Sequence, residues 1–261
     1  MSARRDRILD AMGLAPRWRL RATGATLAAR SPADRDPAPL RFVEIAPAPA
    51  VRAAGAQSLD LDDRAARIGR MEWPELKHAV AGCEGCPLSK TRTNTVFGVG
   101  DERAEWVIVG EAPGAEEDAR GEPFVGQAGR LLDSMLAAIG LRRGENVYIA
   151  NVLKCRPPGN RNPEPFEVAQ CSPHLVRQIE LIRPRLILAM GRAAAQTLLN
   201  TDASIASLRG KLFRYQGVPT IVSYHPAYLL RNLPDKSKAW EDLCYARATM
   251  KELKQALPVP T

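Results

Sequence analysis

Apolar and polar positions alternate in two different rhythms along the C-terminal two-thirds of the chain. Short, continuous apolar runs bounded by turn-forming residues are typical of buried strands, whereas apolar residues spaced three or four apart are typical of helices. The strand pattern occurs at residues 106–110, 147–153, 186–190 and 220–223, and the helical pattern at 126–140, 164–182, 192–199 and 236–257. This alternation predicts a three-layer α/β/α domain around a central four-stranded, mainly parallel sheet.

The first 58 residues lack this alternation. Residues 1–22 combine a short expected helix with a basic, Trp-bearing stretch, and we interpret them as a basic arm. Residues 23–58 are rich in Ala, Pro, Arg and Ser without sustained periodicity, which predicts a disordered linker. A helix over 61–81, broken near Trp73-Pro74, is expected to open a folded domain spanning residues 59–257.

The formal net charge of +8 suggests an acidic partner, nucleic acid first among them. Residues 1–30 hold seven arginines against two aspartates, so the arm region carries +5 and the remaining 231 residues only +3. Charge alone is therefore weak evidence that the folded domain binds DNA. No run of 18 apolar residues exists and the charged N-terminus leads into no long apolar stretch, so neither a membrane span nor a secretory signal is expected, and the cytoplasm is the expected location.

Three chemically distinctive residues stand where the predicted strands end. Glu111 follows the first strand, Asn151 lies in the second, and His225 follows the fourth. Each has an ordinary structural explanation: a carboxylate beside a helix start, a turn-forming amide and a surface imidazole. Ligands of parallel sheets bind at the carboxyl ends of the strands, however, and the convergence of all three residues there favours a binding or catalytic site.

Four cysteines suggest a metal site. Cys83 and Cys86 form a Cys-x-x-Cys pair, and Cys155 and Cys171 follow with fifteen residues between them. Cytoplasmic proteins rarely keep structural disulfides, so a metal or redox role is favoured over two incidental pairs. Four thiolates suit either Zn²⁺ or an iron–sulfur cluster, and the spacing does not separate the two. Cys244 lies on a predicted helix and is interpreted as a small buried hydrophobe.

These motifs resemble the family-4 uracil-DNA glycosylases over about residues 83–247. The resemblance is carried by Gly-Glu-Ala-Pro-Gly-Ala-Glu-Glu-Asp at 110–118, Asn-Val-Leu-Lys-Cys-Arg-Pro-Pro at 151–158 and His-Pro-Ala-Tyr-Leu-Leu-Arg at 225–231. It implies the fold of those enzymes, a [4Fe–4S] cluster in place of zinc, and hydrolysis of the bond between uracil and deoxyribose to leave an abasic site. The implied substrate is uracil-containing DNA, single- or double-stranded, and the implied enzyme is a monomer of the nucleoid.

The resemblance also assigns roles around a uracil extruded from the base stack. Phe124 stacks on the base, and Asn151 accepts from N3–H and donates to O4, a pattern that cytosine would mispair. His225 donates to O2 as the departing base gains negative charge. Glu111 orients water or stabilises the cationic sugar.

Further assignments concern the rim of this site. Leu229 is expected to be a wedge that fills the gap left by the flipped nucleotide. DNA phosphates are expected to be held by the backbone amides of Ala112 to Gly114 and by the side chains of Lys154, Arg161 and Arg231.

The chain departs from the better-known family-1 glycosylases at two positions. Those enzymes carry a water-activating Asp where this chain has Ala112, and a thymine-blocking aromatic residue where it has Gly114. We therefore assign thymine exclusion to Glu117. A related group that traps uracil-DNA covalently carries a His-containing loop after the Asn151 segment; residues 159–163 contain no His, which favours turnover.

Two alternatives concern the whole protein. Residues 2–21 are similar to the start of the psi subunit of the bacterial clamp loader, which implies docking on the chi subunit; the alternative is a basic tail that touches DNA. For the domain, the alternative function is a non-catalytic DNA-binding or replication-accessory module with a structural metal. We expect the cluster itself to be structural, because Cys155 lies only four residues after Asn151.

Overall fold

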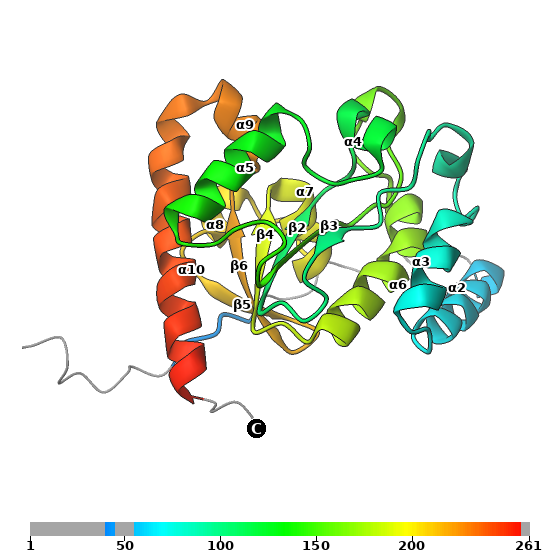
Figure 1. Cartoon of the computed structure of the whole chain (residues 1–261). Helices are drawn as coiled ribbons and strands as arrows, with labels where there is room; N and C mark the ends of the chain where they lie inside the picture. The colour runs from blue at the N-terminus through cyan, green and yellow to red at the C-terminus, as the bar shows by residue number, and fades with distance from the viewer. Residues whose placement is uncertain (1–39, 45–54, 257–261) are drawn as a thin grey trace, which may run out of the picture. The chain divides into compact units, whose positions relative to one another are not determined.

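A six-stranded sheet forms the centre of the computed structural model, which describes residues 40–44 and 55–256 (Figure 1). The strand order is β1-β3-β2-β4-β6-β5, and the inner four strands are parallel. These inner strands are β3 (Val147–Asn151), β2 (Trp106–Gly110), β4 (Leu186–Met190) and β6 (Val218–Ser223). They are the four strands that the apolar runs predict.

Two short antiparallel strands at the edges were not predicted. Strand β1 (Val99–Gly100) has only two residues, too few to show a period. Strand β5 (Leu212–Tyr215) pairs with β6 through the two-residue turn Gln216–Gly217, in which both residues have positive φ, 48° and 79°. Such a turn matches the twist of a hairpin, so β5 depends on turn geometry more than on an apolar run. The predicted four-stranded sheet is therefore a six-stranded one.

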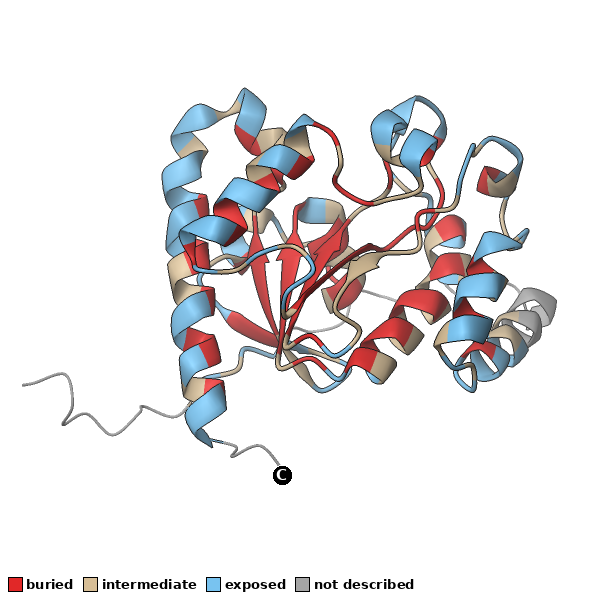
Figure 2. Cartoon of the chain, in the orientation of Figure 1, coloured by how far each residue is buried: buried red, intermediate tan, exposed pale blue. Residues whose placement is uncertain are grey.

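Helices cover both faces of the sheet, as the three-layer prediction requires (Figure 2). Alternate strand residues point to opposite sides: Val107 and Val109 enter one core, and Trp106 and Ile108 enter the other. The first core is closed by α6 (Pro165–Ile182), α7 (Arg192–Leu199) and α8 (Ile205–Leu208). The second is closed by α5 (Gln127–Ala138), α9 (Pro226–Arg231) and α10 (Lys236–Ala256).

The region before the sheet contains two helices where one interrupted helix was expected. Helix α2 spans Gly55–Ile68 and α3 spans Trp73–Ala81, and both pack against α6. Pro74 stands in the first turn of α3, where its missing N–H costs nothing, so the predicted break is a helix start. The remaining elements are the short helices α4 (Ala115–Arg120), η2 (Pro87–Lys90), η3 (Pro158–Asn160) and η4 (Leu233–Asp235).

The prediction of a disordered linker over 23–58 is wrong at two places. Phe42 forms a β-bridge with Leu212, and the Val43 N–H donates to the Leu212 carbonyl at 2.8 Å. The Arg214 guanidinium lies over the Phe42 ring, 3.6 Å from its centroid, so a cation–π contact also holds this segment beside β5. Residues 55–58 belong to α2. The arm at 1–22 and the rest of the linker lie outside the described residues.

No helix within the described ranges is both long and apolar enough to cross a membrane.

Candidate active site

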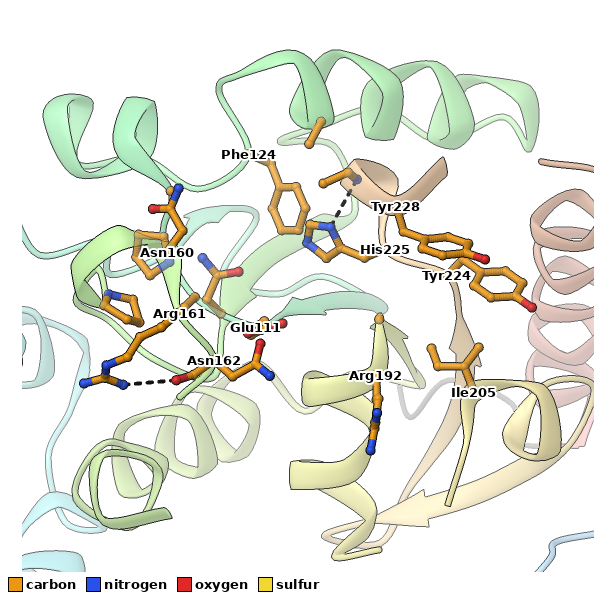
Figure 3. A pocket seen from close by; sticks show the side chains of 18 of the residues that line it. Glu111, Phe124, Asn160, Arg161, Asn162, Arg192, Ile205, Tyr224, His225 and Tyr228 are labelled. Carbon is orange, nitrogen blue, oxygen red and sulfur yellow. Dashed lines mark hydrogen bonds between the residues drawn. The ribbon is translucent and has the colours of Figure 1, made fainter. Parts of the chain in front are cut away.

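A pocket of about 750 Å³ opens where the parallel strands end (Figure 3). Glu111 follows β2, Asn151 ends β3, Gly191 follows β4 and His225 lies two residues after β6, and all four line this pocket. The parallel register places these positions at one edge of the sheet. The three residues singled out at the strand ends are therefore brought together.

His225 is held in one tautomer. Its Nδ1 accepts a hydrogen bond from the Ala227 N–H at 3.1 Å at the start of α9, so the proton of the neutral ring sits on Nε2. Burial lowers the pKa of His225 to about 4, with the positive charge of Arg231 acting in the same direction. The pocket thus contains a neutral imidazole that can donate from Nε2.

Asn151 presents a buried acceptor without a partner. The residue is 2% exposed, and its Oδ1 has no hydrogen-bond partner among the described residues. A Cβ on Gly110 would come within 2.4 Å of this oxygen, so only glycine leaves room for the amide. A buried carbonyl without a donor is costly, and a ligand N–H is what would satisfy it.

Phe124 is held beside His225 in an unusual backbone conformation. The two rings stack with centroids 5.4 Å apart, and Phe124 has φ of 54°, in the left-handed region (Figure 3). The Arg143 guanidinium donates to the Phe124 carbonyl at 2.8 Å and to the Pro123 carbonyl at 2.9 Å. A Cβ on Gly129 would lie 1.7 Å from the Phe124 carbonyl oxygen, so Gly129 is also needed for this loop.

Glu111 is one of the residues that line the pocket (Figure 3). Burial raises the pKa of its carboxyl above the ordinary value. Its backbone carbonyl accepts from the Leu153 N–H at 3.0 Å, which fixes the residue against the segment that follows β3. A carboxylate in this position can stabilise positive charge or take a proton from water.

Glu117 fills the space above Gly114. Its carboxylate accepts backbone hydrogen bonds from Gly114 at 3.1 Å, Val125 at 3.0 Å and Gly126 at 3.2 Å. A Cβ on Gly114 would lie 2.7 Å from Glu117 Oε2, so the carboxylate stands where a larger residue at 114 would project. The Gly114 amide, expected to bind phosphate, is thus already used, and Pro113 has no N–H, which leaves Ala112 of that set.

Two assignments of the rim are corrected. Lys154 is 2% exposed and donates to the Asn151 carbonyl and to Gln178, so it does not reach phosphates. Burial lowers the pKa of Lys154 to about 8. Leu229 is 1% exposed and packs in the core that α5 and α10 close, so it is no wedge; its neighbour Leu230 is the exposed one, at 38%. Leu229 turns inward because its position on α9 sets its direction, and Lys154 turns inward to reach acceptors on β3 and α6.

The other two basic residues do line the pocket. Arg161 is exposed and forms a two-armed ion pair with buried Glu167, at 2.5 and 2.9 Å, which fixes its guanidinium at the pocket edge. Arg231 ends α9 and is exposed. Both are placed for contact with an anionic backbone.

The four cysteines line a single cavity on the other side of the segment that follows β3. No three His, Cys, Asp or Glu side chains in the described part of the chain converge closely enough to hold one metal ion. A tetrahedral zinc needs four sulfurs about 2.3 Å from one point. Four thiol side chains around one cavity form a donor set that suits either Zn²⁺ or an iron–sulfur cluster.

The sulfur atoms are also supplied with hydrogen-bond donors. Arg64 Nη2 lies 3.2 Å from Cys83 Sγ, and Arg92 Nη1 lies 3.3 Å from Cys155 Sγ. The Lys154 N–H donates to Cys171 Sγ at 3.2 Å. Burial nevertheless raises the pKa of the Cys171 thiol to about 12, so burial favours the neutral thiol and a bound metal cation would favour the thiolate.

Several residues around the pocket escaped sequence reasoning. Arg209 donates to buried Asp242 at 2.7 Å, and Ser223, at the end of β6, donates to the same carboxylate oxygen at 2.8 Å. Tyr224 and Tyr228 stack with centroids 5.1 Å apart on the pocket wall (Figure 3). None of these belongs to an apolar period or a recurrent spacing, and only the motif around His225 could have drawn attention to the tyrosines.

Comparison with known proteins agrees with this fold and site. A family model described as the uracil DNA glycosylase superfamily matches residues 97–245, and the chain belongs to this superfamily.

Individual relatives show which group of the superfamily the chain resembles. The type-4 uracil-DNA glycosylase of Archaeoglobus fulgidus is 52% identical over 164 residues, which cover 60% of this chain and 82% of that protein. The type-4 enzymes of Pyrobaculum aerophilum and Thermotoga maritima are 42% and 44% identical, each match covering 66% of this chain and 92% of the relative. Within the superfamily, the chain groups with the type-4 enzymes.

Proposed function

We propose that this protein removes uracil from DNA by hydrolysing the N-glycosidic bond, which leaves an abasic site for base-excision repair. The proposal rests on the Asn151 Oδ1, which no described residue hydrogen-bonds and which is buried in a pocket that also holds Phe124, Glu111 and the Nε2–H of His225. Uracil has an N–H that can donate to Asn151 Oδ1 and a carbonyl oxygen that can accept from the His225 Nε2–H. The pocket thus lacks what uracil supplies.

Base recognition begins with extrusion of the nucleotide from the stack. Phe124 stacks on the face of the base, and the Asn151 amide accepts from N3–H and donates to O4. Cytosine presents an acceptor at N3 and a donor at position 4, so it would leave two buried polar atoms mispaired. A mispaired buried polar atom costs about 1–3 kcal/mol, which makes Asn151 the main source of discrimination against cytosine.

Bond cleavage needs stabilisation of the leaving base and of the sugar. As the bond between N1 and C1′ breaks, its electron pair stays with uracil, and the His225 Nε2–H donates to O2, where the negative charge gathers. The lowered pKa of His225, about 4, keeps this donor neutral, so the proton remains on the ring. Glu111 stabilises the positive charge on the sugar and accepts a proton from the water that attacks C1′.

Exclusion of thymine is assigned to Glu117. Its carboxylate occupies the space above Gly114, where three backbone N–H groups hold it. A methyl group that approached this carboxylate would have to displace a hydrogen-bonded group, which is costly.

Contacts with the DNA backbone are assigned to the Ala112 amide and to Arg161 and Arg231 at the pocket edge. Leu230, exposed beside Arg231, takes the wedge role first assigned to Leu229.

The cysteine cavity is assigned to a [4Fe–4S] cluster held by Cys83, Cys86, Cys155 and Cys171, with Zn²⁺ as the alternative. When bound, the cluster would supply a structural cross-link between the segment before β2, the segment after β3, and α6. Iron analysis and the visible spectrum after anaerobic purification separate the two: iron with broad absorbance near ~400 nm supports the cluster, and zinc without iron overturns it.

The function is tested by uracil release from a single-stranded oligonucleotide by the iron-loaded protein. Release by wild type with near-complete loss in Glu111→Gln and His225→Ala is the expected result. Binding of the oligonucleotide without release by wild type would instead support a non-catalytic DNA-binding module. Arg142→Ala is a matched control, because Arg142 forms an exposed ion pair with Glu145 and does not line the pocket.

For residues 1–22 we propose docking on the chi subunit of the clamp loader, on the sequence resemblance alone. A pull-down with chi should retain the full chain and lose the protein that lacks residues 1–22. Equal retention of both proteins would support the alternative interpretation, in which residues 1–22 are a basic tail that touches DNA.

A further inference from the structure

The Lys154 side chain lies between the cysteine cavity and the base pocket. It is 2% exposed, although lysine is almost never fully buried without a partner. Among the described residues no carboxylate forms an ion pair with its ammonium group, and the two acceptors of that group, the Asn151 carbonyl and Gln178 Oε1, are both neutral; the backbone N–H of the same residue donates to Cys171 Sγ. The cysteine site adjoins this residue, and it would supply compensating negative charge when its thiols bind a metal as thiolates.

On the pocket side, the ammonium group holds the residue that reads the base. Lys154 Nζ donates to the Asn151 carbonyl at 2.9 Å and to Gln178 Oε1 at 2.7 Å. Gln178 is itself fixed, since its Nε2 donates to the Phe97 carbonyl at 3.0 Å and to the Tyr148 hydroxyl at 3.1 Å. The Asn151 backbone is therefore tied to an anchored buried amide through Lys154.

On the cysteine side, the same residue is tied to the metal ligands. Its backbone N–H donates to Cys171 Sγ at 3.2 Å, its carbonyl accepts from Val96 at 2.7 Å, and the next residue is Cys155. One residue thus contacts a ligand through its backbone and the base-reading residue through its side chain.

We propose that Lys154 is a positioning residue that couples the filling of the cysteine site to the placement of the Asn151 amide. The inference rests on the proposed function for the role of Asn151. Four thiolates with a bound cluster carry net negative charge, which holds the ammonium in the interior. The ammonium in turn holds the Asn151 carbonyl and, through it, the end of β3. Without a bound cluster the Lys154 ammonium group lacks this compensating charge, and it no longer fixes the position of the Asn151 carbonyl.

Two substitutions separate the charge of Lys154 from its hydrogen bond. Lys154→Met removes both, and Lys154→Gln removes the charge but keeps a donor. The readouts are iron per chain, the reduction potential of the cluster, and kcat and KM for uracil release.

In Lys154→Met we expect the iron to be retained and the reduction potential of the cluster to become more negative, because a positive charge near it is lost. The kcat should be about tenfold to a hundredfold lower and KM should stay within about threefold. A small misplacement of a base-reading group affects the reaction more than it affects DNA binding. Lys154→Gln should shift the potential equally and lose less kcat. An unchanged potential and kcat in iron-loaded Lys154→Met would overturn the proposal.

The coupling is also tested in wild type, without any variant. The amides of Val152 and Leu153 donate to the Gly110 and Glu111 carbonyls, each at 3.0 Å. Removal of iron with a chelator should speed hydrogen exchange at these two amides and leave those of β4 unchanged. Unchanged exchange at 152 and 153 overturns the proposal even if both variants fail to fold. If wild type released no uracil, the proposed function would fail, whereas potential and exchange would still decide the coupling.

Discussion

The Ala227 N–H donates to His225 Nδ1 at 3.1 Å, and this contact decides what the imidazole offers to the pocket. With Nδ1 used as an acceptor, the neutral ring has its proton on Nε2. Burial and Arg231 keep the pKa of His225 low, at about 4, so the ring does not become charged in the working range of pH. The histidine is therefore a hydrogen-bond donor to the leaving base, and proton transfer falls to Glu111.

The pH dependence of uracil release follows from these two shifts. Burial raises the pKa of Glu111, and the carboxylate form is the active one, so kcat/KM should fall as the pH drops through a value above the usual carboxylate range. His225 stays neutral above about pH 4 and adds no second step there. In His225→Gln the rate should drop about 10²–10³-fold, as for loss of an oxyanion donor, with the acid limb in place. If the fall in kcat/KM at low pH shifts or disappears in His225→Gln, the titrating group is His225 and not Glu111.

Arg143 should matter although it lies outside the motifs. Its guanidinium bonds the carbonyls of Pro123 and Phe124 and so holds Phe124 at positive φ. For Arg143→Ala we expect about tenfold lower kcat/KM and about 2 kcal/mol less stability, the loss of charged hydrogen bonds at a partly exposed site. Arg142→Ala, one residue away in an exposed ion pair, should leave both unchanged. Equal behaviour of the two variants would contradict the assignment.

Glu117 should set the boundary between uracil and thymine. Glu117→Ala opens the space above Gly114, so release of thymine should become measurable and discrimination should fall by about 10- to 200-fold, the value of one methyl group. Glu117→Gln keeps the volume and should still reject thymine. The measurement compares single-turnover rates on oligonucleotides that differ only in that base. Full rejection of thymine by folded Glu117→Ala would remove Glu117 from this role.

The buried pair of Arg209 and Asp242 should be the most sensitive ion pair beneath the pocket. Asp242 is 1% exposed and bonds both Arg209 and Ser223, two residues before His225. Arg209→Met leaves a buried carboxylate without its cation, which costs about 3–5 kcal/mol. Thermal unfolding should show this loss, whereas Lys77→Met, which breaks the exposed pair with Glu102, should change stability by less than about 1 kcal/mol. A small effect of Arg209→Met would mean that solvent reaches Asp242.

Sequence reasoning located the parallel strands and the residues at their ends because both depend on local patterns. Apolar runs identify β2, β3, β4 and β6, and the rule that ligands bind at strand ends then singles out Glu111, Asn151 and His225. The edge strand β5 was missed because its pairing depends on positive φ at Gln216 and Gly217.

The errors in the site have a common physical cause. Lys154 and Leu229 belong to motifs next to the pocket, but the direction of each side chain depends on packing between distant segments. Lys154 turns inward toward Gln178, 24 residues away, and Leu229 turns into the core beneath α9. Arg143 and Asp242 act through contacts of the same long-range kind. A linear motif records which residues are near the chemistry, and not which way they point.

The most direct test is a single-turnover measurement with iron-loaded wild type on three matched single-stranded oligonucleotides that contain uracil, cytosine or thymine at one position. We predict complete release of uracil and no release of cytosine or thymine, with the uracil reaction abolished in Glu111→Gln. Binding of all three oligonucleotides without release of uracil, by protein that carries its full iron, would contradict this prediction.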